Sequence, residues 1–222
     1  MTLQTRIDHL VFAARSLDEG VAWCREHMAI EPAGGGEHVL MGTHNRVFRI
    51  DAPGFERAYF EIIAINPAAP APGRARWFDL DDSRMQAALA QGPRLVHFVA
   101  STNDIERAVE ALAAQGIDRG TVIPVERGNL RWKMTVRPDG QRLMEGALPT
   151  LIQWEGPHPC DSLPTSGATL ASFSAAHPQA DALRAAYDAI GLGNVIVRDG
   201  NAEMKAAIST PIGRVVLESK GI

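Results

Sequence analysis

The sequence contains few cysteines, few aromatic residues and no long apolar run. Only Cys24 and Cys160 occur among 222 residues, too few for a disulfide framework or a zinc ribbon. No stretch of about 18 consecutive apolar residues is present, so a transmembrane helix is not expected. The N-terminal segment lacks the basic start and apolar run of a signal peptide. We therefore expect a protein of the reducing cytoplasm.

An excess of basic residues is also missing. The chain has 22 Lys and Arg against 26 Asp and Glu, which gives a formal net charge of −4. Proteins that bind nucleic acid usually carry a basic stripe that displaces counterions from phosphate. Neither nucleic acid nor a membrane is therefore expected as a partner. Hydrophobic residues make up 45% of the chain, which is enough to bury a core, although aromatics contribute only 6%.

One pattern occurs three times along the chain. A short apolar strand followed by a helix with one apolar face starts at residues 7–30, 95–117 and 168–192. Further strand candidates follow each helix. Single helices separated by several strands favour an α+β fold over a doubly wound parallel sheet. The sequence thus predicts repeated βαβββ modules.

The repeats set the expected boundaries. They are a βαβββ module at 1–66, a linker with a short helix at 67–94, a second βαβββ module at 95–160 and a C-terminal βαββ(β) module at 168–222. The third unit carries no metal-ligand type of residue on its first strand. We expect it to be structural, either extending the sheet, covering an open edge or forming the interface of a homodimer.

Two histidines occupy the same place in the first two repeats. His9 and His97 lie 88 residues apart, each on the first strand of its unit and flanked by apolar residues of the same face. A polar residue also interrupts the last strand of each unit, Glu61 in the first and Gln153 in the second. A carboxylate inside an apolar strand is costly unless it is paired or metal-bound.

These residues and several longer motifs resemble the vicinal oxygen chelate superfamily, and more narrowly a glyoxalase-like family of bacterial proteins with a third module. The matching segments are IDHLVFAA (7–14), GGGEHVLMGTHN (34–45), YFEII (59–63), RWKMTV (131–136), LPTLIQWEGPHP (148–159) and STPIGRVVLES (209–219). The resemblance implies that two modules pair into a cup of mixed sheet. It also implies that metal ligands come from the first and last strands, here His9, Glu61, His97 and Gln153.

The resemblance points to a divalent metal, since two imidazoles and a carboxylate suit Zn, Ni, Mn or Fe. Such an ion would bind vicinal oxygens of a small substrate and stabilise an enediolate, with Glu61 as the catalytic base. Gln153 departs from the pattern, because related enzymes usually place glutamate there and an amide cannot act as a base. Instead of binding metal, Glu61 could pair with a buried arginine such as Arg131.

A second polar cluster is expected to line the mouth of the cup. His38, Thr43, His44 and Asn45 follow three glycines in a strand-turn-strand pattern. Arg131 alternates with Trp132 on a strand, so only one of the two can face the cavity. Trp154 and His158 follow Gln153 and could close the pocket. The expected substrate-binding residues are His38, Thr43, His44, Asn45, Arg131, Trp154 and His158.

Three functions fit this pattern. The first is a metal-dependent lyase or isomerase that acts on a small vicinal-oxygen substrate between modules 1 and 2. The second is a non-catalytic protein that binds or sequesters a small molecule, in the manner of resistance proteins. The third is a ring-cleaving dioxygenase. All three take a small-molecule ligand in the cup.

Overall fold

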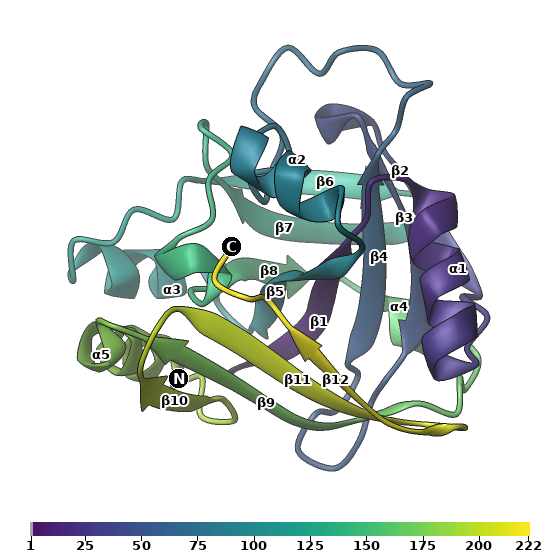
Figure 1. The fold of residues 1–222 in the computed structure, drawn as a ribbon. Helices are drawn as coiled ribbons and strands as arrows, with labels where there is room; N and C mark the ends of the chain where they lie inside the picture. The colour runs from purple at the N-terminus through teal and green to yellow at the C-terminus, as the bar shows by residue number, and fades with distance from the viewer. Residues whose placement is uncertain (1) are drawn as a thin grey trace.

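A computed structural model describes residues 2–222 (Figure 1). An eight-stranded mixed sheet runs in the order β2-β3-β4-β1-β5-β8-β7-β6, and a separate four-stranded sheet runs in the order β10-β9-β11-β12. Helices flank both sheets. The predicted α+β class with repeated modules is therefore confirmed.

The first half of the eight-stranded sheet is module 1. Its elements are β1 (Thr5–Ala13), α1 (Leu17–Met28), β2 (Gly34–His38), the 3₁₀ turn η1 (Val39–Met41), β3 (Thr43–Arg49) and β4 (Tyr59–Ile65). α1 is capped at its N-terminus, because the Ser16 hydroxyl accepts a hydrogen bond from the Glu19 amide.

Module 2 repeats this element order. It consists of β5 (Arg94–Thr102), α3 (Ile105–Ala113), β6 (Thr121–Arg127), β7 (Leu130–Val136), the 3₁₀ turn η2 (Met144–Gly146) and β8 (Thr150–Trp154). In each module the first strand pairs in parallel with the last, β1 with β4 and β5 with β8. The two first strands pair antiparallel at the centre of the sheet and so join the modules.

Both central strands contain a bulge at the equivalent place. Ile7 and His9 pair with consecutive residues of β5, so Asp8 is an extra residue in β1. Val96 is likewise the extra residue of β5, next to His97. A bulge bends the strand and redirects side chains, so neighbouring residues do not simply alternate between the two faces. Asp8 and His9 consequently share one buried environment.

The third unit forms the separate sheet. Its elements are β9 (Thr169–His177), α5 (Ala180–Ile190), β10 (Ile196–Asp199), β11 (Glu203–Thr210) and β12 (Gly213–Glu218), preceded by the one-turn helix α4 (Pro159–Ser162). Its pairing differs from that of the modules, because β9 lies between β10 and β11. The first strand therefore does not pair with the last.

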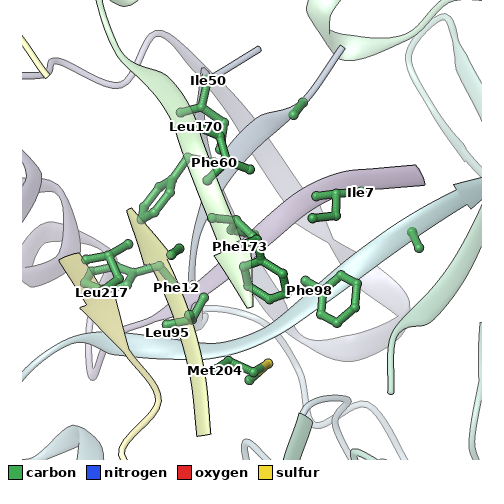
Figure 2. Packing of buried hydrophobic residues seen from close by; sticks show 14 of the residues in the cluster. Ile7, Phe12, Ile50, Phe60, Leu95, Phe98, Leu170, Phe173, Met204 and Leu217 are labelled. Carbon is green, nitrogen blue, oxygen red and sulfur yellow. The ribbon is translucent and has the colours of Figure 1, made fainter. Parts of the chain in front are cut away.

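This sheet packs against the outer face of the eight-stranded sheet. Phe173 of β9 packs against Phe98 of β5 with ring centroids 4.8 Å apart and the rings tilted by 56°, and both belong to one buried cluster with Phe12 and Phe60 (Figure 2). The third unit thus neither extends the main sheet nor covers its edge. It buries the apolar face opposite the cup, a contribution of about 1.5–3 kcal/mol for each large side chain. The expected homodimer stays a prediction.

The linker between the modules covers the inner face. Its helix α2 (Ser83–Leu89) places Met85 and Leu89 in a second apolar cluster with Val11 and Val99 of the central strands. Phe78 belongs to the same cluster and has a positive φ of 60°. A bulky residue rarely adopts this conformation, which costs of order 1–3 kcal/mol and persists only where packing holds it.

The N-terminus of α3 is capped by an aspartate. α3 begins after Asp104, whose carboxylate accepts a hydrogen bond from the Arg107 amide. Within residues 2–222, no helix is long and apolar enough to cross a membrane. Cys24 is buried on α1, as its place on the apolar face predicts, and burial raises the pKa of its thiol to about 12.

Candidate functional site

A small polar cavity lies on the inner face of module 1. It is lined by His9 of β1, His38 of β2, Asn45 of β3 and Glu61 of β4, and Arg127 of β6 reaches it from module 2. Aromatic side chains form the remaining walls, chiefly Tyr59, Trp77, Phe78, Trp132 and Trp154. The cavity has a volume of about 40 Å³, roughly the space of three water molecules. It is therefore a small site that is partly open to solvent.

His9 is held in a fixed orientation by its neighbour in the bulge. Its Nδ1–H donates to Asp8 Oδ1 at 2.7 Å, and its ring stacks on Tyr59 at a centroid distance of 4.4 Å. The bond to Asp8 directs Nε2 toward the cavity. Both side chains are almost fully buried.

Asp8 is the centre of a buried hydrogen-bond network. Its Oδ2 accepts from Trp154 Nε1 at 2.8 Å and from His158 Nε2 at 3.2 Å. The tautomer of His158 follows from the Cys160 amide, which donates to its Nδ1. Burial alone would raise the pKa of Asp8, but the hydrogen bonds from His158 and His9 outweigh it and hold that pKa well below its usual value. Asp8 is therefore a buried carboxylate anion at neutral pH.

Glu61 faces His9 across the cavity. Its Oε1 accepts from Asn45 Nδ2 at 2.6 Å, and its Oε2 lies 3.6 Å from His9 Nε2. Asn45 is itself oriented, because its Oδ1 accepts from the Gly36 amide. Only one oxygen of the carboxylate is thus occupied by the described residues, and the other is directed toward the imidazole.

His38 is a neutral acceptor in this site. Its Nδ1–H donates to Thr43 Oγ1 at 3.0 Å, and its Nε2 accepts from Asn45 Nδ2 and from Arg127 Nη1. Burial, together with the nearby Arg127 charge, lowers the pKa of His38 to about 4 despite the opposing effect of Glu61. His38 therefore positions Asn45 and Arg127 and carries no charge at neutral pH.

The cationic residue of the cavity is Arg127, which reaches it from the end of β6. The expected arginine, Arg131, is instead exposed on β7 and pairs with Glu126 at 3.2 Å. The alternative pairing of Glu61 with Arg131 is therefore wrong. Trp132, next to Arg131 on the strand, is the residue that faces the cavity, and the Arg127 guanidinium lies 5.9 Å from its ring centroid.

The other expected substrate-binding residues are divided between two faces. Thr43 supports His38, and Trp154 lines the cavity. His158 lies behind Trp154 as a partner of Asp8 and does not line the cavity. His44 alternates with Thr43 and Asn45 along β3, so its side chain lies on the opposite face.

Module 2 uses the equivalent positions differently. His97 Nδ1–H donates to the Gly146 carbonyl at 2.9 Å, and its Nε2 accepts from the Thr150 amide at 3.0 Å. The backbone register explains the choice of partner, because Val11 pairs with Glu61 and Val99 pairs with Thr150. Thr150 is thus the counterpart of Glu61.

Gln153 lies away from the cavity. Its Oε1 accepts from the amide of Ile105 in the first turn of α3 at 2.8 Å. The reason is strand alternation, since Ile152 and Trp154 on either side of it face the cavity. Gln153 therefore supports the N-terminal end of α3 and does not line the cavity.

The ligand set that the family resemblance implies does not fit a metal here. Both nitrogens of His97 are used by protein groups, Gln153 is on the opposite face, and His38 Nε2 accepts from Asn45 and Arg127. Among residues 2–222, no group of three or more His, Cys, Asp or Glu side chains is placed to hold a metal ion. His9 Nε2 and Glu61 Oε2 are the two ligand atoms left facing the cavity.

The arrangement is suited to proton transfer. An oriented imidazole and a carboxylate oxygen face one another, a guanidinium lines the same cavity, and aromatic rings form most of the other walls. A low-dielectric surrounding strengthens each of these electrostatic interactions. Glu61 and His9 can therefore remove and return a proton, while Arg127 can bind an anionic oxygen.

Sequence reasoning missed several residues of this site. Asp8 was visible as a carboxylate beside His9, but alternation placed it on the other face. Thr150 could have been found by aligning the starts of the two last strands, YFE with LPT, which places Thr150 opposite Glu61. The alignment of Glu61 with Gln153 matched only their polarity. Arg127 and Trp77 had no signal, because they come from a strand end and a linker.

The chain matches a sequence profile of the glyoxalase-like domain over residues 7–191. It belongs to this family, and the predicted resemblance to a glyoxalase-like family is confirmed. A comparison with curated protein sequences finds no match.

Solved structures with a similar fold are distant in sequence. A hypothetical protein from Staphylococcus aureus is 16% identical, with 90% of this chain and 87% of that chain covered and a TM-score of 0.60. A variant of methylmalonyl-CoA epimerase from Streptomyces coelicolor, in complex with 2-nitronate-propionyl-CoA, is 19% identical over 69% of this chain and 99% of that chain, with a TM-score of 0.44. The Mycobacterium tuberculosis methylmalonyl-CoA epimerase is 18% identical over 70% and 91%, with a TM-score of 0.39. At these identities the likeness concerns the fold alone.

Proposed function

We propose that this protein is an isomerase or lyase that moves a proton on a small, anionic, oxygen-bearing substrate, with Glu61 as the catalytic base. One observation carries the proposal: a buried Glu61 oxygen faces the Asp8-oriented His9 imidazole at 3.6 Å in a cavity that Arg127 also lines. Acid-base pairs of this kind are typical of enzymes that transfer protons.

Each residue has a role that follows from its contacts. Glu61 Oε2 takes a proton from the carbon next to a carbonyl, and the electron pair moves onto the carbonyl oxygen. Arg127 stabilises the resulting oxyanion, as preorganised cations do in water-excluded sites. The proton then returns to another atom of the substrate, either directly from Glu61 or after passing from Glu61 Oε2 to His9 Nε2, which lies 3.6 Å away. Asn45 holds the second oxygen of Glu61 and so fixes the direction of Oε2.

A divalent metal has no step in this proposal. The superfamily resemblance implies one, but His97 and Gln153 do not join His9 and Glu61 in the cavity. The same arrangement counts against a ring-cleaving dioxygenase that holds iron through His9, His97 and Glu61. Arg127 instead supplies the positive charge, and it lies at 3.3 Å from His38 Nε2 within the site.

Solvent deuterium exchange tests the proposal. The purified protein is incubated in deuterium oxide with pyruvate, 2-oxobutyrate or glyceraldehyde, and exchange at the carbon next to the carbonyl is followed by NMR. We expect exchange of at least one probe to be faster with protein than without it. Glu61→Gln should slow this exchange by about 10²–10⁴-fold, the typical contribution of a general base.

A matched variant distinguishes the loss of the catalytic base from nonspecific effects of replacing a glutamate. Glu26 is exposed on α1, so Glu26→Gln should leave the exchange rate unchanged. Full exchange activity in Glu61→Gln with an unaltered circular dichroism spectrum would refute the role of Glu61. Absence of protein-dependent exchange with all three probes would count against proton-transfer chemistry on this substrate class.

Binding without turnover is the second candidate function. It is favoured by the aromatic walls, since Trp77, Trp132 and Trp154 surround the cavity and such rings supply ligand-binding surface without any chemistry. Quenching of tryptophan fluorescence by the same probes would report binding. Equal affinity in the wild type and in Glu61→Gln, together with no exchange in either, would favour a binding protein.

A further inference from the structure

A second buried cation lies in module 2 and is not part of the site described above. Arg119 stands just before β6 and is 3% exposed. Its Nη2 donates to Thr150 Oγ1 at 2.8 Å. Its Nε and Nη1 are fully buried and have no hydrogen-bond partner among the described residues. Two sets of guanidinium N–H groups therefore lack an acceptor.

Asp118 and Asp139, the carboxylates whose charge acts on Arg119, are both paired with another arginine. Among residues 2–222, no carboxylate lies within salt-bridge distance of its guanidinium, and the nearby Asp118 and Asp139 pair with Arg137. The small cavity that Arg119 lines is also bordered by Arg137 and Arg142, and no Asp or Glu borders it. Of these three arginines, Arg137 pairs with Asp139 and Arg142 pairs with Asp79, so Arg119 is the one without a carboxylate partner among the described residues.

A buried guanidinium without a counter-ion is energetically unfavourable. An unpaired charge costs several kcal/mol on removal from water, and arginine is protonated at all physiological pH values. Unpaired buried N–H groups add about 1–3 kcal/mol each. Nearly all such groups in folded proteins have a partner, which is often an ordered water molecule or an ion.

We propose that the Arg119 cavity is a binding site for one small monovalent anion, such as chloride, held by Nε–H and Nη1–H of Arg119. The size of the cavity supports this class of ligand. Its volume of about 20 Å³ corresponds to a single water-sized species, so a phosphate or sulfate does not fit. A halide also accepts hydrogen bonds from several N–H groups at once. Its negative charge balances the positive charge of the buried Arg119 guanidinium.

The anion site is connected to the second histidine but not to the proton-transfer pair. Arg119 donates to Thr150 Oγ1, whose hydroxyl lies 3.0 Å from His97 Nε2. Phe78 packs on His97 with ring centroids 5.1 Å apart and borders both cavities. Anion binding is therefore expected to stabilise module 2 without requiring any activity at Glu61.

Thermal unfolding in different salts tests the proposal. The full chain is compared in sodium gluconate, whose anion is too large for the cavity, and in sodium chloride or bromide at the same ionic strength. We expect the halides to raise the Tm of the wild type by about 2–4 °C, as a ligand that binds only the folded state does. Arg119→Met should abolish the difference between gluconate and chloride. Arg131→Met, which removes an exposed arginine of the neighbouring strand, should retain it.

Crystals of the wild type soaked in sodium bromide give an answer that needs no variant. We expect an anomalous bromine peak next to Nε and Nη1 of Arg119. A water molecule at this place with no anomalous signal, or bromide at surface positions only, would overturn the proposal. Equal halide stabilisation in wild type and Arg119→Met would overturn it as well.

Discussion

Modules 1 and 2 have the same strands and the same central bulge, but they use them for different purposes. His9 and His97 are equivalent, and so are Glu61 and Thr150. In module 1 the imidazole nitrogen and the carboxylate oxygen face a cavity. In module 2 both nitrogens of His97 are used by protein groups. Equivalent positions therefore do not give equivalent chemistry, because neighbouring groups decide which atoms are free.

The difference begins with one residue in each bulge. Asp8 is the extra residue beside His9, and Val96 is the extra residue beside His97. The Asp8 carboxylate accepts a hydrogen bond from Nδ1–H of His9. Valine has no acceptor on its side chain, and Nδ1–H of His97 instead donates to the Gly146 carbonyl. Module 1 consequently buries two carboxylates, and module 2 buries the cation Arg119.

The largest expected effect on stability comes from replacing Asp8, the charged bulge residue of module 1, by a neutral residue. Asp8→Asn removes the anion that accepts from His9, Trp154 and His158, and hydrogen bonds to buried charged groups are each worth about 1.5–3 kcal/mol. We expect the free energy of unfolding in urea to fall by about 3 kcal/mol.

Two variants serve as comparisons for Asp8→Asn. Asp188 is exposed on α5, so Asp188→Asn should change stability by less than about 0.5 kcal/mol. Arg119→Met in chloride-free buffer should not destabilise, because it removes an unpaired buried charge. If Asp8→Asn were as stable as the wild type, the Asp8 network would not be what stabilises module 1.

An intermediate loss of stability is expected when the pH is lowered. The pKa of His38 is lowered to about 4, so the unfolded chain binds a proton at His38 below about pH 6.5 that the folded chain does not. Stability from this group is therefore present above pH 6.5 and is lost as pH falls toward 4. We expect a loss of about 2 kcal/mol between pH 7 and pH 4.5.

The variant His38→Gln isolates this contribution. Urea unfolding at pH 7 and pH 4.5 should show a smaller loss in His38→Gln than in the wild type, by about 2 kcal/mol. His97, whose pKa burial also lowers, contributes equally to both proteins. Identical pH dependence in the two proteins would contradict a neutral, buried His38.

The smallest expected effect concerns the polar residue of β8. Gln153→Ala removes a hydrogen bond to the first turn of α3 and should destabilise by about 0.5–1 kcal/mol. The deuterium-exchange rate should not change, because the side chain lies outside the cavity. A large loss of exchange activity in a folded Gln153→Ala protein would place this residue in the site after all.

Much of the fold follows from the sequence, because apolar periodicity and the 88-residue repeat specify the elements and the modules, and the family resemblance implies that two modules pair. The same repeat identifies His9, His97 and Glu61 as inner-face residues. It does not distinguish Thr150 from Gln153, since register depends on backbone pairing between β5 and β8. A one-residue change of register moves every side chain to the other face.

The remaining parts of the site depend on long-range packing. The bulge at Asp8 arises from pairing with β5, so strand alternation within β1 gives the wrong face. Arg127 enters the cavity from module 2, and Trp77 enters from the linker. The role of the third unit was also unpredictable, because no local pattern specifies which face of another sheet it covers.

The linker residues Trp77 and Phe78 form a wall that both cavities share. Phe78 adopts a left-handed conformation there and packs on His97, while Trp77 lies edge-on to His38 at 4.9 Å. A ligand that displaces this wall from one side changes the space on the other. By thermodynamic reciprocity, any effect of the Arg119 occupant on affinity at Glu61 equals the effect of a Glu61 ligand on the occupant. One strained turn thus forms part of the wall of both cavities.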